Sequence, residues 1–267
     1  MGTRKVGHAG TLDPMATGIL VLGIERATKL LGHLSLDRKT YLARIVLGSS
    51  TVTEDIEGET LTSADPDAVA AVTDDDITAA MTPLRGEIQQ VPSAVSAIKV
   101  DGKRAYERVR DGERVELDPR PVTVHRFDLL NLRRKWDSIE LDVLVECSAG
   151  TYVRALARDL GATLGVGGHL NLLRRTTVGP FTLGGARTLE QLDTEPRLTF
   201  DLDAAVDVAF PRRDVDAELA RAVQHGQRIV PAGIDGTYGV FDPDGRVLAL
   251  SVDEESQARS VVVLAPA

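Results

Sequence analysis

The chain has 267 residues, of which 43% are hydrophobic, and a formal net charge of −9 at pH 7. This length accommodates one large domain and a smaller one, with enough apolar residues for their cores. No apolar run is long enough to span a bilayer, no signal-peptide pattern opens the chain, and the single cysteine, Cys147, excludes an internal disulfide and a zinc cluster. We therefore expect a cytoplasmic protein that binds no membrane.

The segment from Gly7 to Gly18 (GHAGTLDPMATG) places one carboxylate, Asp13, between a glycine-rich turn and a proline, five residues after His8. Proline fixes its own φ and restricts the preceding residue to extended conformations, so Asp13 lies on stiff backbone. A lone acid on a rigid loop suits catalysis, but an Asp before Pro also commonly does no more than cap a turn. The apolar run Ile19–Ile24 that follows predicts a buried strand.

The next elements are predicted from local composition. Residues 28–34 predict a helix, residues 40–47 predict a strand, and residues 74–81 predict a helix whose first turn carries acids that the helix dipole favours. The segment 92–120 is rich in Lys and Arg, which suits nucleic-acid binding. Its part from Tyr106 to Val115 also fits a solvated amphipathic helix without a partner.

Periodic patterns mark the rest of the large domain. Apolar residues alternate with mostly polar ones over 139–147, which is the period of a half-buried strand. Leu156, Leu160 and Leu164 follow four residues apart, and they predict a helix over about 153–164 with one apolar stripe. Because helices and strands are mixed without a βαβ alternation, we expect an α+β fold with a mixed sheet.

A smaller β-rich unit is predicted after Phe200. Residues 218–225 predict a short helix, and a strand over 238–241, the turn Asp-Pro-Asp-Gly and a strand over 247–250 predict a hairpin. Residues 260–264 predict a last strand.

Four blocks of this sequence resemble those of the bacterial TruB-type tRNA pseudouridine synthases. The first is Gly7–Gly18, in which the Asp of Gly-Thr-Leu-Asp-Pro is the family's catalytic residue. The other blocks are Leu47-Gly48 with Thr51, Thr53, Asp55 and Gly58; Arg85-Gly86 with Gln90, Pro92, Ser96-Ala97, Lys99, Gly102 and Tyr106; and Cys147–Arg154 with Asp159-Leu160-Gly161 and Leu173-Arg174-Arg175-Thr176. The resemblance covers most of the chain.

The resemblance implies a domain organisation and an activity. It implies a pseudouridine synthase catalytic domain over 1–204, in which 92–120 is a thumb-like insertion that closes over RNA, and a small PUA-like RNA-binding domain over 205–267. The implied reaction is isomerisation of uridine to pseudouridine at position 55 in the T-loop of tRNA, by a monomer that needs no cofactor and no metal. The implied partner is the tRNA T-stem-loop.

The resemblance also assigns residues to the site. Asp13 is implied as the catalytic group, Arg154 as its ion-pair partner, and Tyr41 as the residue that stacks on the flipped base and helps to remove the C5 proton. Further residues are implied to bind the substrate (His8, Lys29, Tyr152 and Leu173) or the RNA (Lys99, Lys103, Arg104, Arg108, Arg174 and Arg175). Arg174 and Arg175 alternatively support the site, Tyr41 and Leu173 alternatively belong to the core, and Arg154 alternatively is a surface arginine.

The implied chemistry suits a single carboxylate. Cleavage of the N1–C1′ bond develops positive charge on the ribose, which a nearby carboxylate stabilises or attacks, as in glycoside hydrolysis. The sequence leaves attack at C1′, proton abstraction at C2′ and addition to C6 of uracil open. An Asp in an apolar pocket takes up a proton unless a cation holds it ionised, so we expect a buried Asp13–Arg154 ion pair.

The distribution of charge reconciles an acidic chain with an RNA partner. Residues 1–50 and 91–135 each carry a net charge of +4, whereas residues 51–90 carry −9 and residues 193–267 carry −7. The positive charge therefore gathers around the first block and the central basic segment, where phosphates would be bound.

The chain departs from the family pattern at its start. Members normally carry an extra strand and a Lys-Pro-containing segment upstream of the first block, whereas Met1–Lys5 leads almost directly into it. We expect the missing strand to expose a sheet edge and to lower stability. A module that binds and remodels tRNA without chemistry therefore stays open. A nucleoside or RNA N-glycosidase also stays open, because it would use the same carboxylate chemistry.

Overall fold

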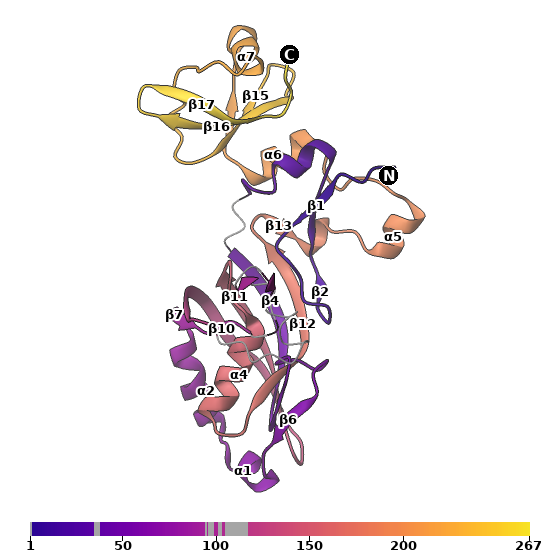
Figure 1. Cartoon of the computed structure of the whole chain (residues 1–267), viewed down its shortest axis with the longest axis vertical. Coiled ribbons are helices and arrows are strands. Elements are labelled where there is room, and N and C mark those ends of the chain that lie inside the picture. The colour runs from indigo at the N-terminus through magenta and orange to yellow at the C-terminus, as the bar shows by residue number, and fades with distance from the viewer. Residues whose placement is uncertain (1, 35–37, 94, 96–98, 101–102, 105–116) are drawn as a thin grey trace. The chain divides into compact units, whose positions relative to one another are not determined.

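The computed structural model describes residues 2–34, 38–93, 95, 99–100, 103–104 and 117–267, and its backbone forms two compact units (Figure 1). Unit 1 comprises Met1–Thr11, Leu20–Leu36 and Gly179–Ala267, and unit 2 comprises Leu12–Ile19 and Asp37–Val178. The sequence predicted one cut between residues 204 and 205. The contacts instead group two N-terminal segments and residues 179–204 with the C-terminal part.

Unit 2 is built on one mixed sheet in the strand order β12-β4-β11-β10-β7. These strands are antiparallel to their neighbours, and the short β2 pairs parallel to β12. The strands of this sheet are β2 (Thr17–Gly18), β4 (Arg38–Leu47), β7 (Gly86–Gln90), β10 (Arg120–Arg134), β11 (Ile139–Ser148) and β12 (Gly168–Val178). Two small hairpins lie outside it, β5 (Ser49–Thr51) with β6 (Thr60–Ser63) and β8 (Lys99–Val100) with β9 (Lys103–Arg104).

One face of this sheet packs against helices. The inward residues of β4 and β11 form the main core with α2 (Asp74–Met81) and α4 (Val153–Thr163), which lie on the same side of the sheet in Figure 1. The helix α1 (Pro66–Ala71) and the 3-10 turn η2 (Thr82–Leu84) flank α2. The predicted strands 40–47 and 139–147 and helices 74–81 and 153–164 are thereby confirmed, and so is the α+β class with a mixed sheet.

Helix α4 lies unusually close to the backbone of the chain that follows it. A Cβ added at Gly161 would meet Gly167 C and Gly168 N at 2.2 Å, a distance that real Cβ atoms do not show. Only glycine allows this approach of helix to strand. The close packing fixes the second half of α4 against the start of β12.

Two predictions near the N-terminus are wrong. The run Ile19–Ile24 forms only β3 (Val21–Ile24), which pairs with β1 (Val6–Ala9) in a two-stranded ribbon, and Leu20 and Leu22 are exposed. Residues 27–31 cover the ribbon at Gly7 and Gly23, whereas the side chains of Leu20 and Leu22 are left exposed, so the strand is only partly buried. Residues 28–34 form no α-helix, because the 3-10 turn η1 (Glu25–Lys29) starts earlier and passes into turns, as is usual for short connectors.

Unit 1 ends in a four-stranded sheet of order β14-β15-β16-β17. Its strands are β14 (Arg212–Asp214), β15 (Tyr238–Phe241), β16 (Val247–Glu254) and β17 (Gln257–Val263). The predicted hairpin is β15–β16, and the predicted helix 218–225 is α7 (Ala217–Gln224). Upstream lie β13 (Phe181–Thr182), η3 (Leu183–Gly185), α5 (Leu189–Thr194) and α6 (Leu202–Ala209). This sheet-rich part agrees with the expected PUA-like domain.

The division into units has a simple packing reason. Leu30 is 2% exposed and belongs to one apolar cluster with Val206, Phe241 and Leu250, so the segment 20–36 is buried against α6 and the C-terminal sheet. A second cluster joins α7 to the other side of this sheet. None of the helices among the described residues is long and apolar enough to cross a membrane.

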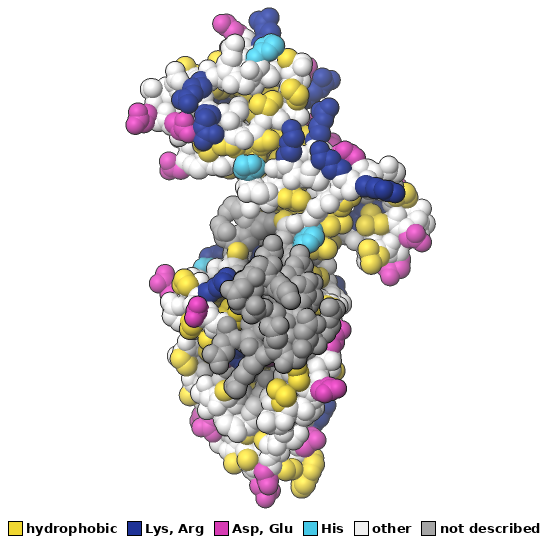
Figure 2. Space-filling model, viewed as in Figure 1, with side chains coloured by type: hydrophobic (Ala, Val, Ile, Leu, Met, Phe, Trp, Pro, Cys, Tyr) yellow, Lys and Arg dark blue, Asp and Glu magenta, His cyan; other side chains and the backbone are white. Residues whose placement is uncertain are grey.

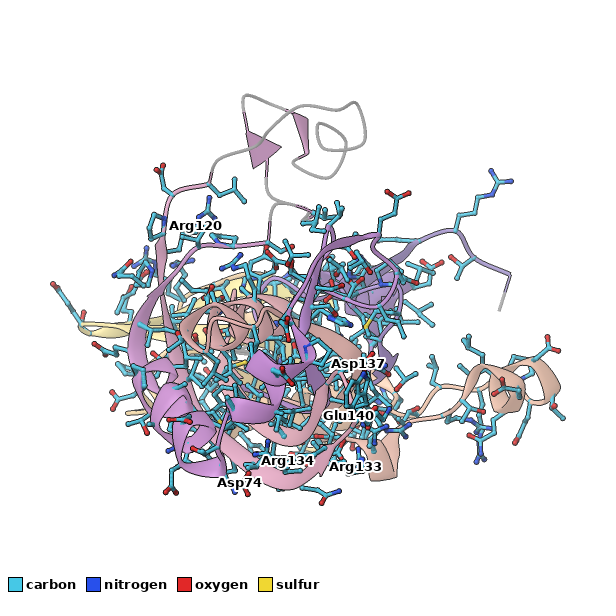
Figure 3. The ribbon with its side chains drawn as sticks, turned by 90° about the horizontal axis from the view of Figure 1, so that it is seen from below. Asp74, Arg120, Arg133, Arg134, Asp137 and Glu140 are labelled. Atoms are coloured by element: carbon cyan, nitrogen blue, oxygen red, sulfur yellow. The ribbon has the colours of Figure 1, made fainter. Side chains whose placement is uncertain are left out.

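The second face of the unit 2 sheet carries a ladder of charges. Asp142 of β11 accepts hydrogen bonds from Arg44 of β4 at 2.7 Å and from Arg133 of β10 at 2.8 Å. Arg133 also binds Glu140, and the two lie with Arg134 and Asp74 at the same end of the sheet in Figure 3. These partners lower the pKa of Asp142 to about 2, chiefly through the hydrogen bond with Arg133.

We expect Asp142→Asn to lower the free energy of unfolding by about 1 kcal/mol at pH 7, a value reduced for the partial exposure of the pair. Since folding lowers this pKa, the contribution is complete above about pH 4 and is lost as pH falls toward 2. Urea unfolding at pH 7 and pH 3 measures it. Asp128→Asn, which removes an exposed partner of Arg126, is the control and should change little. An Asp142→Asn variant as stable as wild type at pH 7 would contradict the expectation.

Candidate active site

The loop that carries Asp13 is fixed by a hydrogen bond within its own turn and by the pairing of β2 with β12. Ala16 N donates to Asp13 O at 3.0 Å, which closes a turn over Pro14. After it, β2 pairs with Arg174 and Arg175 of β12, and Gly18 has a φ of 101° with its Cα so close to β12 that a Cβ would meet Arg175 O at 2.1 Å. The loop is therefore fixed on the central sheet, and the Asp13 side chain is left 29% exposed.

Arg154 binds Asp13 with two nitrogens. Its Nε donates to Oδ2 at 3.1 Å and its Nη2 donates to Oδ1 at 3.0 Å, and the arginine itself is 4% exposed. The sequence predicted that these two side chains meet, although 141 residues separate them. The alternative of a surface arginine does not hold. Because a guanidinium stays charged and its fork matches a carboxylate, this pair sets both the charge and the orientation of Asp13.

The other donors of Arg154 are also occupied. Its Nη1 donates to Thr53 O at 2.8 Å and Ser93 Oγ at 3.1 Å, and its Nη2 donates to Val95 O at 3.0 Å. A buried arginine with every donor satisfied has one orientation, since any rotation would leave donors unpaired. Two segments distant in the chain, 51–58 and 91–95, thus fix the residue that fixes Asp13.

A second carboxylate faces the same arginine. Asp55 is 3% exposed, and its Oδ2 lies 3.7 Å from Arg154 Nε. Its other oxygen accepts hydrogen bonds from Thr53 Oγ1 and from the amide of Glu57 at 3.1 Å. The sequence alone assigns no role to Asp55 or Ser93. The spacing Thr51-x-Thr53-x-Asp55 was the only signal, and it says nothing of the arginine that these residues meet.

Tyr41 and Leu173 lie in the apolar core of unit 2. Tyr41 is 8% exposed and Leu173 is 3% exposed, and both belong to the main cluster with Met15 and Ala16 packed against it. Burial raises the pKa of Tyr41 to about 12, although its hydrogen bond with Arg175 lowers it in part. The wall of apolar groups next to the Asp13 loop therefore includes one phenol that stays protonated at neutral pH.

Tyr152 and Gln90 fix the start of α4. Gln90 is 2% exposed and binds the backbone of Tyr152 twice, since its Oε1 accepts from Tyr152 N at 2.8 Å and its Nε2 donates to Tyr152 O at 3.1 Å. Tyr152 is the residue before the first turn of α4, which contains Arg154. The backbone of Tyr152 thus helps to set the register of Arg154, and substrate contact by its ring stays a prediction.

The remaining predicted residues are spread over the fold. Arg175 is completely buried and donates from Nε to Ile19 O at 2.8 Å, which fits the supporting role rather than contact with RNA, whereas Arg174 is exposed. The backbone of Lys99, Lys103 and Arg104 forms the β8–β9 hairpin, and Arg108 lies outside the described residues. His8 on β1 and Lys29 in η1 belong to unit 1, and their roles stay predictions.

The charged side chains of this site include Asp13, Asp55, Arg154 and Arg175. No group of three or more His, Cys, Asp or Glu side chains in the described part of the chain could hold a metal ion. The described site can present one partly exposed carboxylate of fixed orientation beside a buried apolar wall. Such an arrangement stabilises positive charge on a bound group or attacks an electrophilic carbon.

We expect Tyr41 not to ionise below pH 11, because its phenolate would lose hydration in the core. Ultraviolet titration of wild type and Tyr41→Phe measures this among the four tyrosines of the chain. The two absorbance curves should coincide up to pH 11. Loss of a component that titrates near pH 10 in the variant would show that Tyr41 is hydrated.

Comparisons with known proteins identify the family of this chain. The profile described as "TruB family pseudouridylate synthase (N terminal domain)" matches residues 1–153, which include Asp13, Tyr41 and Asp55. The profile "tRNA pseudouridylate synthase B C-terminal domain" matches residues 154–203, and "tRNA Pseudouridine synthase II, C terminal" matches residues 210–265. The three profiles together cover nearly all of the chain.

Individual relatives give the same result. The chain is 58% identical over 268 residues to "tRNA pseudouridine synthase B" of Rhodococcus jostii, covering 100% of this chain and 87% of that protein. It is 58% identical to the protein of the same name from Mycobacteroides abscessus, over 99% of this chain and 88% of that one. Its fold is similar to that in "Crystal Structure of a Cbf5-Nop10-Gar1 Complex", with a TM-score of 0.69 and 24% identity over 98% of this chain and 77% of the other. The chain therefore belongs to the TruB family of pseudouridylate synthases.

Proposed function

We propose that the chain isomerises uridine to pseudouridine in the T-loop of tRNA, at position 55 of the standard tRNA numbering. The observation that carries this proposal is the Asp13 carboxylate held by two nitrogens of the buried Arg154. The relatives at 58% identity are named for tRNA and for the same reaction, which supports tRNA as the substrate of this chain. We propose that it acts as a cytoplasmic monomer.

Asp13 is the catalytic residue in this proposal. The N1–C1′ bond of uridine breaks, the uracil turns, and C5 forms a bond with C1′, while the C5 proton is lost and N1 gains one. Positive charge develops on the ribose during cleavage, and a carboxylate of fixed orientation stabilises it. Arg154 balances the charge of Asp13 before the substrate arrives, and it holds the partly exposed carboxylate in one orientation.

The substrate base must leave its stack to reach this carboxylate. A uridine in a folded loop is extruded at a cost of a few kcal/mol, which contacts in the pocket repay. Tyr41 and Leu173 supply an apolar wall for the uracil, and the Tyr41 phenol is protonated at neutral pH. We assign His8 to the gap that the extruded nucleotide leaves, and Lys29 to a phosphate.

Basic residues outside the pocket bind the RNA backbone in this proposal. Arg174 is exposed on β12, and Arg120 lies at the end of β10 where the basic segment 92–120 joins the sheet (Figure 3). On the face shown in Figure 2, separate Arg side chains also lie on the part of unit 1 that contains β15–β17, among acidic and apolar ones. Acidic side chains occur instead at the end of unit 2 that contains α1, where a phosphate backbone would be repelled.

We expect Asp13→Asn to abolish the reaction and to leave RNA binding nearly unchanged, because the amide cannot supply the negative charge. The assay is tritium release from a T-stem-loop transcript labelled at C5 of uridine, with binding followed by fluorescence anisotropy. Isomerisation releases tritium and leaves the chain intact, an N-glycosidase leaves an abasic site, and a binding module does neither. Tritium release by Asp13→Asn at the wild-type rate would refute the role of Asp13.

We expect Arg154→Lys to lower the single-turnover rate by at least about 100-fold, because an ammonium cannot form the two-nitrogen contact or satisfy the three other acceptors. Binding of the T-stem-loop should change by less than about threefold. Circular dichroism checks that α4 is retained. A fully active Arg154→Lys enzyme would show that the fork geometry is not needed.

A further inference from the structure

A second arginine of α4, Arg158, binds the two segments that Arg154 also binds, around residues 53 and 93. Arg158 follows Arg154 by four residues, so both side chains lie on one face of the helix. Its Nη1 donates to Glu54 Oε1 at 2.7 Å, and its Nη2 donates to Val91 O at 2.8 Å. Arg154 likewise binds Thr53 O in the first segment, and Ser93 Oγ and Val95 O in the second.

The Glu54 backbone is in a conformation that glutamate rarely adopts. Its φ is +61°, in the left-handed region that favours glycine. The conformation is held by two backbone hydrogen bonds, from Leu170 N to Glu54 O at 3.0 Å and from Glu54 N to Thr51 O at 3.2 Å. A strained backbone of this kind persists only where surrounding contacts hold it, which indicates a specific contact of the Glu54 side chain.

That contact is the ion pair between the Glu54 carboxylate and Arg158. The Glu54 side chain is 12% exposed, its Oε1 binds Arg158, and its Oε2 is buried without a hydrogen-bond partner among the described residues. Arg158 is also fixed from its own helix, since its Nε donates to Asp159 Oδ1 at 2.8 Å. A buried carboxylate with one cationic partner depends on that partner for its position.

Glu54 lies between the two residues of its segment that meet Arg154. The carbonyl of Thr53 accepts from Arg154 Nη1, and the Asp55 carboxylate faces Arg154 Nε. A shift of Glu54 would move both groups, because they are its neighbours in one tight turn. The position of Glu54 is therefore transmitted to Arg154, and from Arg154 to Asp13.

We propose that Glu54 and Arg158 are positioning residues, which hold the turn 51–58 against α4 so that Arg154 presents Asp13 correctly. This inference rests on the proposed function of Asp13. The pair touches neither Asp13 nor any reacting atom in this role. It acts through the orientation of Arg154 alone. An ion pair that only stabilised the fold would change the free energy of unfolding and leave the single-turnover rate of bound RNA unchanged.

Glu54→Gly separates the two roles. Glycine adopts a positive φ without strain, so the variant should fold with a melting temperature no lower than that of Glu54→Ala, which keeps the strain and also loses the pair. We expect Glu54→Gly to lower the single-turnover rate of tritium release by about 10- to 100-fold, with the Kd for the T-stem-loop unchanged.

Two further measurements complete the test. Asp128→Asn is the matched control, because it removes an exposed Arg–Asp contact of the same unit and should keep the wild-type rate. Hydrogen exchange of the Arg154 Nε–H, followed by NMR without RNA, should be faster in Glu54→Gly and unchanged in Asp128→Asn. This arm does not depend on catalysis, so an inactive wild-type enzyme would refute the proposed function and leave the inference to be decided by exchange.

The inference is overturned if Glu54→Gly reacts at the wild-type rate, or if its Arg154 Nε–H exchanges as slowly as in wild type. A slower rate with unchanged exchange also counts against it, because the effect would then not pass through Arg154.

Discussion

The structure of the site depends on one buried guanidinium whose donors are all used. Arg154 meets Asp13 with two nitrogens and three further acceptors with the remaining hydrogens. Burying a charge is costly unless it is paired and hydrogen-bonded, so each of these partners contributes to keeping the arginine in place. Asp13 consequently has a fixed charge and a fixed direction, and both are conditions for stabilising a cationic ribose.

The rest of unit 2 can be understood as the support of this arginine. Gln90 binds the backbone at the start of α4, and Gly161 lets the same helix approach β12 closely. The Asp13 loop is held from the other side, where Gly18 lies against Arg175. The helix that carries Arg154 and the loop that carries Asp13 therefore both pack against β12.

Much of this fold could be predicted from the sequence, and the reasons differ between elements. The strands at 40–47 and 139–147 and the helices at 74–81 and 153–164 have strong periodic patterns that match their burial. The run 19–24 has the composition of a buried strand, but its burial depends on how many strands pair beside it, which local pattern does not report. The grouping of residues 20–36 with the C-terminal part could not be predicted for a related reason, because Leu30 packs on a cluster more than 170 residues away in the chain.

The site could be predicted only where a family pattern named its residues. Asp13 and Arg154 came from motifs, and Asp55 belonged to one without a role. The contacts of Asp55, Ser93 and Glu54 with α4 are made between loops, and no sequence spacing describes them. The most direct measurement is a crystal structure of the chain with a T-stem-loop RNA. The account predicts the target uridine extruded, with its ribose beside Asp13 and Arg154 still bound to both Asp13 oxygens. A stacked uridine, or an Asp13 side chain turned away from Arg154, would contradict it.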